Sequence, residues 1–113
     1  MNKELIEKWI SALRSGKYLQ TTLALRDNYG FCCLGVFCDI VDNTLWETAP
    51  GGVYYYAYCM RSYAPGNKWK NVIPFIEQSI LSEMNDGGSS FKEIADFIEE
   101  ELNLYIETKV YDE

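Results

Sequence analysis

Residues 30–40, GFCCLGVFCDI, constrain the fold more than any other segment, because eleven residues there carry a single charge. A helix that begins at Cys32 places positions 32, 35, 36 and 39 on one face. An apolar helix of this kind belongs in the core of a domain. Gly35 on this face allows a neighbouring element to approach closely. The carboxylate of Asp39, in contrast, needs a polar partner.

Asp39 has two candidate kinds of partner. Arg14 and Arg26 are the natural candidates for an ion pair, because a guanidinium satisfies a carboxylate with two parallel hydrogen bonds. A bound ligand is the other candidate. The sequence leaves structural pairing and ligand binding equally open for Asp39.

The four cysteines do not have the spacing of a metal site. Structural zinc takes four ligands, usually from CxxC pairs or with histidine, and the chain has no histidine. Adjacent Cys32 and Cys33 cannot easily ligate one ion, and Cys59 is distant. A catalytic thiol usually needs histidine as its base, although a helix N-terminus is another means of lowering its pKa. We interpret the cysteines as small buried apolar residues and expect neither a metal nor a cofactor.

Length and composition indicate one domain over residues 1–113. The apolar fraction of 48% suffices for a packed core. No apolar run is long enough to cross a membrane, and the N-terminus lacks the pattern of a signal peptide. We therefore expect a cytoplasmic protein with free thiols and no membrane partner.

The net charge of −7 comes entirely from the C-terminal part of the chain. Residues 1–61 carry six basic and six acidic side chains, whereas residues 62–113 carry four basic and eleven acidic ones. An acidic surface repels phosphate backbones, so we expect no nucleic-acid polymer as a partner. A small anion held in a local basic pocket stays compatible with this charge.

Hydrophobic periodicity predicts an α+β fold, a small single domain with about four helices packed with a short antiparallel sheet. A Ser90-x-x-Glu93 capping box begins the last helix. The tail after residue 102 is expected to add an edge strand or to fray. The expected elements are helices at 3–14, from 32, at 75–84 and from 91, strands at 22–26 and 53–60, and a loop at 62–71.

A cluster of basic, aromatic and amide side chains spans the end of the first expected helix and the strand after it. Arginine and lysine bind phosphate, tyrosine stacks on a base and an amide reads a base edge, so the set suits a small anionic ligand. Tyrosines at 54, 56 and 58 alternate onto one strand face and extend the stacking surface. A surface patch of solvated side chains explains the composition equally well. The cluster consists of Arg14, Lys17, Tyr18, Gln20 and Arg26.

The segment NDGGSSFKEIADFIEE resembles the sequence of a helix–turn–helix motif, but the outward face of its expected helix is acidic. A recognition helix presents basic and amide side chains to phosphates and bases. Here Lys92 accompanies Glu93, Asp96, Glu99 and Glu100 on the outward face. DNA binding is therefore disfavoured, and the acidic face suits a protein that imitates a nucleic acid.

Three segments, ALRSGKYLQTTLALRD, FCCLGVFCDI and NDGGSSFKEIADFIE, resemble a widespread family of small phage-encoded proteins. The family pattern is LRSGKYxQ, CCLGVxCD and NDxGxSFxEIA, and the resemblance covers residues 9–40 and 85–99. Residues 41–84 match little of it, and QTTLAL replaces an expected Gly- or Lys-containing stretch. The family is similar to viral nucleotide sponges, which bind cyclic oligonucleotide or related immune signals without cleaving them and so disarm CBASS or Thoeris defence.

The resemblance implies a non-enzymatic phage anti-defence protein, without catalytic residues, that sequesters a nucleotide second messenger in the host cytoplasm. A homodimer or higher homo-oligomer would provide room for the pocket. The alternative is an acidic inhibitor of a host nucleic-acid-binding or defence protein, and a third is hydrolysis by Asp39 and Asp86 with a divalent metal. The implied ligand-binding residues are Arg14, Lys17, Tyr18, Gln20, Arg26, Cys33, Asp39, Asn85 and Asp86.

Overall fold

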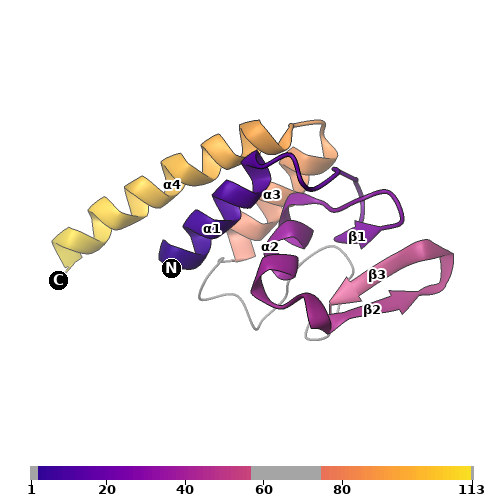
Figure 1. The fold of residues 1–113 in the computed structure, drawn as a ribbon. Coiled ribbons are helices and arrows are strands. Elements are labelled where there is room, and N and C mark those ends of the chain that lie inside the picture. The colour runs from indigo at the N-terminus through magenta and orange to yellow at the C-terminus, as the bar shows by residue number, and fades with distance from the viewer. Residues whose placement is uncertain (1–2, 57–74, 113) are drawn as a thin grey trace.

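A computed structural model describes residues 3–56 and 75–112 and confirms the α+β class (Figure 1). Within these ranges four α-helices accompany a three-stranded antiparallel sheet of order β1-β3-β2. The elements are α1 (Lys3–Arg14), β1 (Arg26–Asp27), α2 (Cys33–Val41), the 3₁₀ turns at Asn43–Leu45 and Pro50–Gly52, β2 (Trp46–Ala49), β3 (Val53–Tyr56), α3 (Phe75–Asp86) and α4 (Phe91–Asp112).

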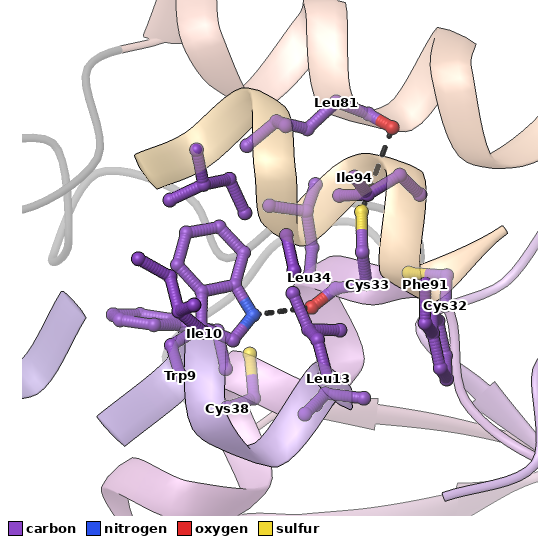
Figure 2. Packing of buried hydrophobic residues seen from close by; sticks show 14 of the residues in the cluster. Trp9, Ile10, Leu13, Cys32, Cys33, Leu34, Cys38, Leu81, Phe91 and Ile94 are labelled. Atoms are coloured by element: carbon purple, nitrogen blue, oxygen red, sulfur yellow. Dashed lines mark hydrogen bonds between the residues drawn. The ribbon is translucent and has the colours of Figure 1, made fainter. Parts of the chain in front are cut away.

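Helix α2 forms the centre of the core, as its apolar sequence predicts. Leu34, Val36 and Phe37 are fully buried. The indole Nε1 of Trp9 in α1 donates a hydrogen bond to the backbone carbonyl oxygen of Cys33 at 2.8 Å, as Figure 2 shows. This bond satisfies the polar atom of a buried tryptophan and joins α1 to the first turn of α2.

Helices α1 and α4 lie side by side and run in opposite directions (Figure 1). Each presents an apolar stripe at helical spacing, and the described outward residues are exposed, as predicted. Burying each large aliphatic side chain contributes roughly 1.5–3 kcal/mol. The buried positions of the two stripes are Ile6, Trp9, Ile10 and Leu13 in α1 and Phe91, Ile94, Ala95 and Ile98 in α4.

Gly35 allows the close approach that the sequence predicts, and the neighbour is the backbone at Leu25. A Cβ atom at Gly35 would overlap the carbonyl oxygen of Leu25. That oxygen also accepts a hydrogen bond from the backbone N–H of Cys32 at 3.0 Å. The chain just before β1 is therefore pressed against the first turn of α2.

The predicted strand at 22–26 is largely wrong. Only Arg26 and Asp27 pair in the sheet, with Tyr54 and Val53 of β3. Leu23 has a φ of 66°, a left-handed conformation that no strand accommodates. The strand predicted at 53–60 is confirmed over Val53–Tyr56, and the rest of it lies outside the described residues.

The C-terminal part of the chain is one long helix. The capping box is confirmed, because Ser90 and Glu93 exchange hydrogen bonds at 3.0 and 3.1 Å. The helix is 22 residues long, so the edge strand, one of the two alternatives expected after residue 102, is wrong. The predicted helix at 75–84 is confirmed and ends two residues later, whereas the predicted loop at 62–71 lies outside the described residues. No described helix is both long enough and apolar enough to cross a membrane.

Candidate functional site

Arg26 in β1 lies against three aromatic rings. Its guanidinium carbon is 4.4 Å from the ring centre of Tyr54, 4.9 Å from that of Phe31 and 5.5 Å from that of Trp46. Pairing places these groups together, because Arg26 is opposite Tyr54 in the sheet and forms a bridge with Phe31. Each cation–π contact contributes about 0.5–2 kcal/mol, depending on desolvation. We call Arg26, Phe31, Trp46 and Tyr54 the Arg26 cluster.

The charge of Arg26 has no carboxylate partner among the described residues. Its guanidinium likewise donates to no acceptor in that part of the chain. The sequence of residues 57–74, which follows β3, contains three basic residues and no aspartate or glutamate. A guanidinium is planar, with donors along its edge. Because these donors meet no acceptor among the described residues, they are available to an anion.

Asp39 pairs with neither predicted arginine. Its Oδ2 accepts a hydrogen bond from the hydroxyl of Tyr18 at 2.7 Å, and its Oδ1 accepts one from Nε1 of Trp46 at 3.1 Å. Burial, followed by the hydrogen bond to Asp39, raises the pKa of Tyr18 to about 12. The prediction of an Arg14 or Arg26 partner is therefore wrong, because two uncharged donors already satisfy the carboxylate.

Arg14 is occupied by acidic residues of α4. Its two terminal nitrogens are 2.7 Å from Asp96 Oδ1 and 2.7 Å from Glu99 Oε2. The hydrogen bond to Asp96, followed by that to Glu99, raises the pKa of Arg14. This double ion pair joins α1 to α4 and removes Arg14 from the set of cations that could hold phosphate. Lys17 is exposed, and its backbone N–H bonds Ser15 Oγ at 3.1 Å.

Asn85 at the end of α3 is fully buried and joins three parts of the chain. Its Oδ1 accepts hydrogen bonds from Gln20 Nε2 at 2.9 Å and from the backbone N–H of Cys33 at 3.2 Å. Its Nδ2 donates to the carbonyl oxygen of Thr21 at 2.8 Å. Asp86 beside it accepts from the backbone N–H of Leu23 at 2.9 Å. Four predicted ligand residues, at 20, 33, 85 and 86, thus hold the loop before β1 against α2 and α3.

The described cysteines confirm the interpretation as buried apolar residues. Cys32, Cys33 and Cys38 are free and buried. Burial raises the pKa of Cys32 to about 12 and that of Cys33 well above its ordinary value. Cys33 Sγ also donates to the carbonyl oxygen of Leu81 at 3.5 Å (Figure 2). Thiols in this state are poor nucleophiles. Within the described ranges no three acidic, cysteine or histidine side chains converge as metal ligands.

The acidic face of α4 is largely committed to internal contacts. Asp96 and Glu99 hold Arg14, and Glu93 completes the capping box with Ser90. The hydrogen bonds from Ser90 lower the pKa of Glu93. Glu100 is exposed. Three of the carboxylates that would imitate phosphates therefore have structural roles. Glu93 caps the start of α4, and Asp96 and Glu99 hold α1 against α4.

Sequence patterns did not indicate a binding role for two residues of the Arg26 cluster, Phe31 and Trp46. They flank α2, one before it and one after the 3₁₀ turn that follows it, so no common periodicity links them. Tyr54 was expected as a stacking residue, and the structure places its ring against Arg26. The sequence feature that pointed towards a cluster of rings is the high aromatic content of 15%, but composition does not say which positions form the cluster.

The Arg26 cluster lies wholly within the segment that comparison with known families identifies. The profile of a family described as a domain of unknown function (DUF8296) matches residues 1–72. This range contains α1, α2, the described sheet and Asp39, whereas α3 and α4 lie outside it. No curated protein and no solved structure matches the chain. Because the match spans more than half of its length, the chain belongs to the DUF8296 family.

Proposed function

We propose that the protein binds a small anionic ligand at the Arg26 cluster and that this ligand is a nucleotide immune signal, held without cleavage. In this proposal the protein is a phage anti-defence sponge that acts in the host cytoplasm. One observation supports it most: the guanidinium of Arg26 contacts three aromatic rings and has no carboxylate partner among the described residues. Arginine edges bind phosphate with two parallel hydrogen bonds, and aromatic rings stack on bases.

The proposal removes Arg14 from the expected phosphate contacts and keeps Arg26. Arg14 already holds two carboxylates, so an anion would have to displace Asp96 and Glu99. Trp46 and Tyr54 are half-buried, which leaves part of each residue accessible to a stacking base. The exposed ammonium of Lys17 is a second cation for a ligand with more than one phosphate.

The two alternative functions receive less support. An acidic inhibitor would need the α4 carboxylates at its interface. Glu93, Asp96 and Glu99 are exposed, but each already forms a hydrogen bond or an ion pair within the chain. Metal-assisted hydrolysis would need Asp39 and Asp86 together. They belong to separate hydrogen-bond networks, one around Tyr18 and one around Leu23.

The experiment is a thermal-shift screen of the purified protein against cyclic dinucleotides, cyclic oligonucleotides and cyclic ADP-ribose, followed by calorimetry on any hit. Arg26→Ala should abolish the shift, and Arg26→Lys should recover only part of it, because lysine keeps the charge but loses the planar donors. Arg14→Ala is the control, which removes an exposed arginine outside the Arg26 cluster and should leave affinity unchanged.

Chromatography of the ligand released by heating completes the test. Intact ligand is the expected result. The proposal fails if no nucleotide changes the melting temperature, if Arg14→Ala and Arg26→Ala weaken binding equally, or if the released material is a cleavage product.

A further inference from the structure

Asp39 and Gly35 lie one turn apart on α2, and both act on the surroundings of Arg26. Gly35 receives the backbone of Leu25, the residue directly before Arg26. Asp39 binds the side chains of Tyr18 and Trp46. The same face of α2 therefore controls where the backbone that carries Arg26 lies and where a ring of the cluster lies.

The carboxylate of Asp39 holds two aromatic side chains at once, one through each oxygen. Between them lies Phe31, which packs edge-on against Tyr18 with ring centres 5.0 Å apart and against Trp46 with ring centres 6.0 Å apart. Edge-to-face pairs are geometrically specific, because the positive edge of one ring meets the negative face of the other. Fixing the two outer rings therefore fixes the inner one.

We infer that Asp39 is a positioning residue for the anion site: it fixes the Trp46 and Phe31 rings against which the Arg26 guanidinium lies. This inference rests on the proposed function and deepens it. Asp39 is unsuited to contact the ligand itself, because its negative charge repels an anion and each of its oxygens already accepts a hydrogen bond. Its contribution is the orientation of Arg26, which an anion needs before it can form two parallel bonds.

The inference also gives the Cys32, Gly35 and Asp39 positions of the CCLGVxCD motif a common role, which is to place the groups around Arg26. Cys32 caps the helix by accepting a hydrogen bond from the backbone N–H of Gly35 at 3.4 Å. Gly35 admits Leu25, and Asp39 holds the rings. The resemblance implied that Asp39 contacts the ligand, whereas in this inference Asp39 acts through Tyr18 and Trp46.

The test uses Asp39→Asn in the full chain, with Glu47→Gln as the matched control. Glu47 is an exposed carboxylate next to Trp46 in the sequence, so its variant removes the same charge from a nearby position. Asparagine retains one acceptor but presents an amide donor where the second acceptor was, so one of the two bonds is lost. Tyr18→Phe and Trp46→Phe each remove one donor while keeping an aromatic ring.

Two readouts separate positioning from general stability. The first is the nuclear magnetic resonance spectrum of the ligand-free protein, in which the Arg26 side-chain signals carry ring-current shifts from the cluster. The second is affinity for two probes, cyclic di-GMP and inorganic phosphate. We expect Asp39→Asn to reduce the Arg26 shifts and to weaken binding of the probes about tenfold, the equivalent of one lost hydrogen bond. Glu47→Gln should change neither readout.

Each other outcome is decisive. If Asp39→Asn weakens binding while the Arg26 shifts stay at the wild-type values, Asp39 contacts the ligand directly and the inference is overturned. If the variant lowers only the melting temperature, the role is structural and the inference is again overturned. If Asp39→Asn does not fold, Tyr18→Phe, which removes one hydroxyl, decides by the same two readouts. If wild-type protein binds neither these probes nor any nucleotide of the screen, the proposed function fails, and the Arg26 shifts alone decide the positioning role.

Discussion

Asn85→Ala removes only one amide group, and we expect it to lower the free energy of unfolding strongly. The amide of Asn85 is fully buried and forms hydrogen bonds to Gln20, Thr21 and the backbone N–H of Cys33. Alanine removes the donor and the acceptor together. The loop before β1, the start of α2 and the end of α3 then lose the group that joins them.

The magnitude follows from the partners that are left. The backbone N–H of Cys33 lies in a fully buried residue, and the carbonyl oxygen of Thr21 loses its Asn85 donor. Each buried polar group without a partner costs about 1–3 kcal/mol. Gln20 keeps its bond to the Ser89 carbonyl oxygen at 2.8 Å, so it adds little. We expect the free energy of unfolding to fall by roughly 3–5 kcal/mol, a large part of the usual 5–15 kcal/mol.

Urea unfolding followed by circular dichroism measures this loss, and the midpoint should fall while the m value stays constant. Ser79→Ala, an exposed position of the same helix, is the control and should stay within about 0.5 kcal/mol of wild type. Gln20→Ala should lie in between. A loss below about 1 kcal/mol for Asn85→Ala, with an unchanged m value, would refute the reasoning, because it would mean that water replaces the amide at no cost.

Three further predictions concern single contacts. Gly35→Ala should destabilise the protein by roughly 1–3 kcal/mol in urea unfolding, because its methyl group overlaps the carbonyl oxygen of Leu25. Tyr18 should stabilise the fold fully below its unfolded pKa of about 10 and lose this contribution as the pH rises towards its folded pKa of about 12. Melting curves of Tyr18→Phe should therefore depend less on pH in that window. Arg14→Gln should lower the melting temperature at low salt, with the loss shrinking as sodium chloride screens the pairs to α4.

Each of these has a result that contradicts it. Wild-type stability in Gly35→Ala would show that α2 does not approach Leu25 closely. Parallel pH profiles for Tyr18→Phe and wild type would show that the hydroxyl titrates at its ordinary pKa. A salt-independent loss in Arg14→Gln would assign the effect to packing of its methylene groups rather than to charge.

Sequence patterns predicted the helices and the buried role of the described cysteines, because these depend on local spacing. The apolar stripe of α1 and the capping box at Ser90 both involve residues a few positions apart. The glycine at position 35 predicted a close approach, but not that the neighbour is Leu25. The strand before residue 26 was predicted wrongly because tertiary contacts override propensity there. Asp86 holds the N–H of Leu23 and stabilises a left-handed turn in its place.

The choice of partners was beyond the reach of local patterns. Arg14 meets acids 82 and 85 residues away, and Asp39 meets Tyr18 and Trp46 rather than an arginine. Sequence patterns indicate that a face is buried or that a charge needs a partner. They do not indicate which of several candidate partners the packing of the chain will place in contact. By itself, then, the sequence determined the α+β class, the central apolar helix and the need of Asp39 for a partner. Only the tertiary structure decided that Arg14 is occupied and that Arg26 lies among aromatic rings, because those contacts arise from the packing of distant segments.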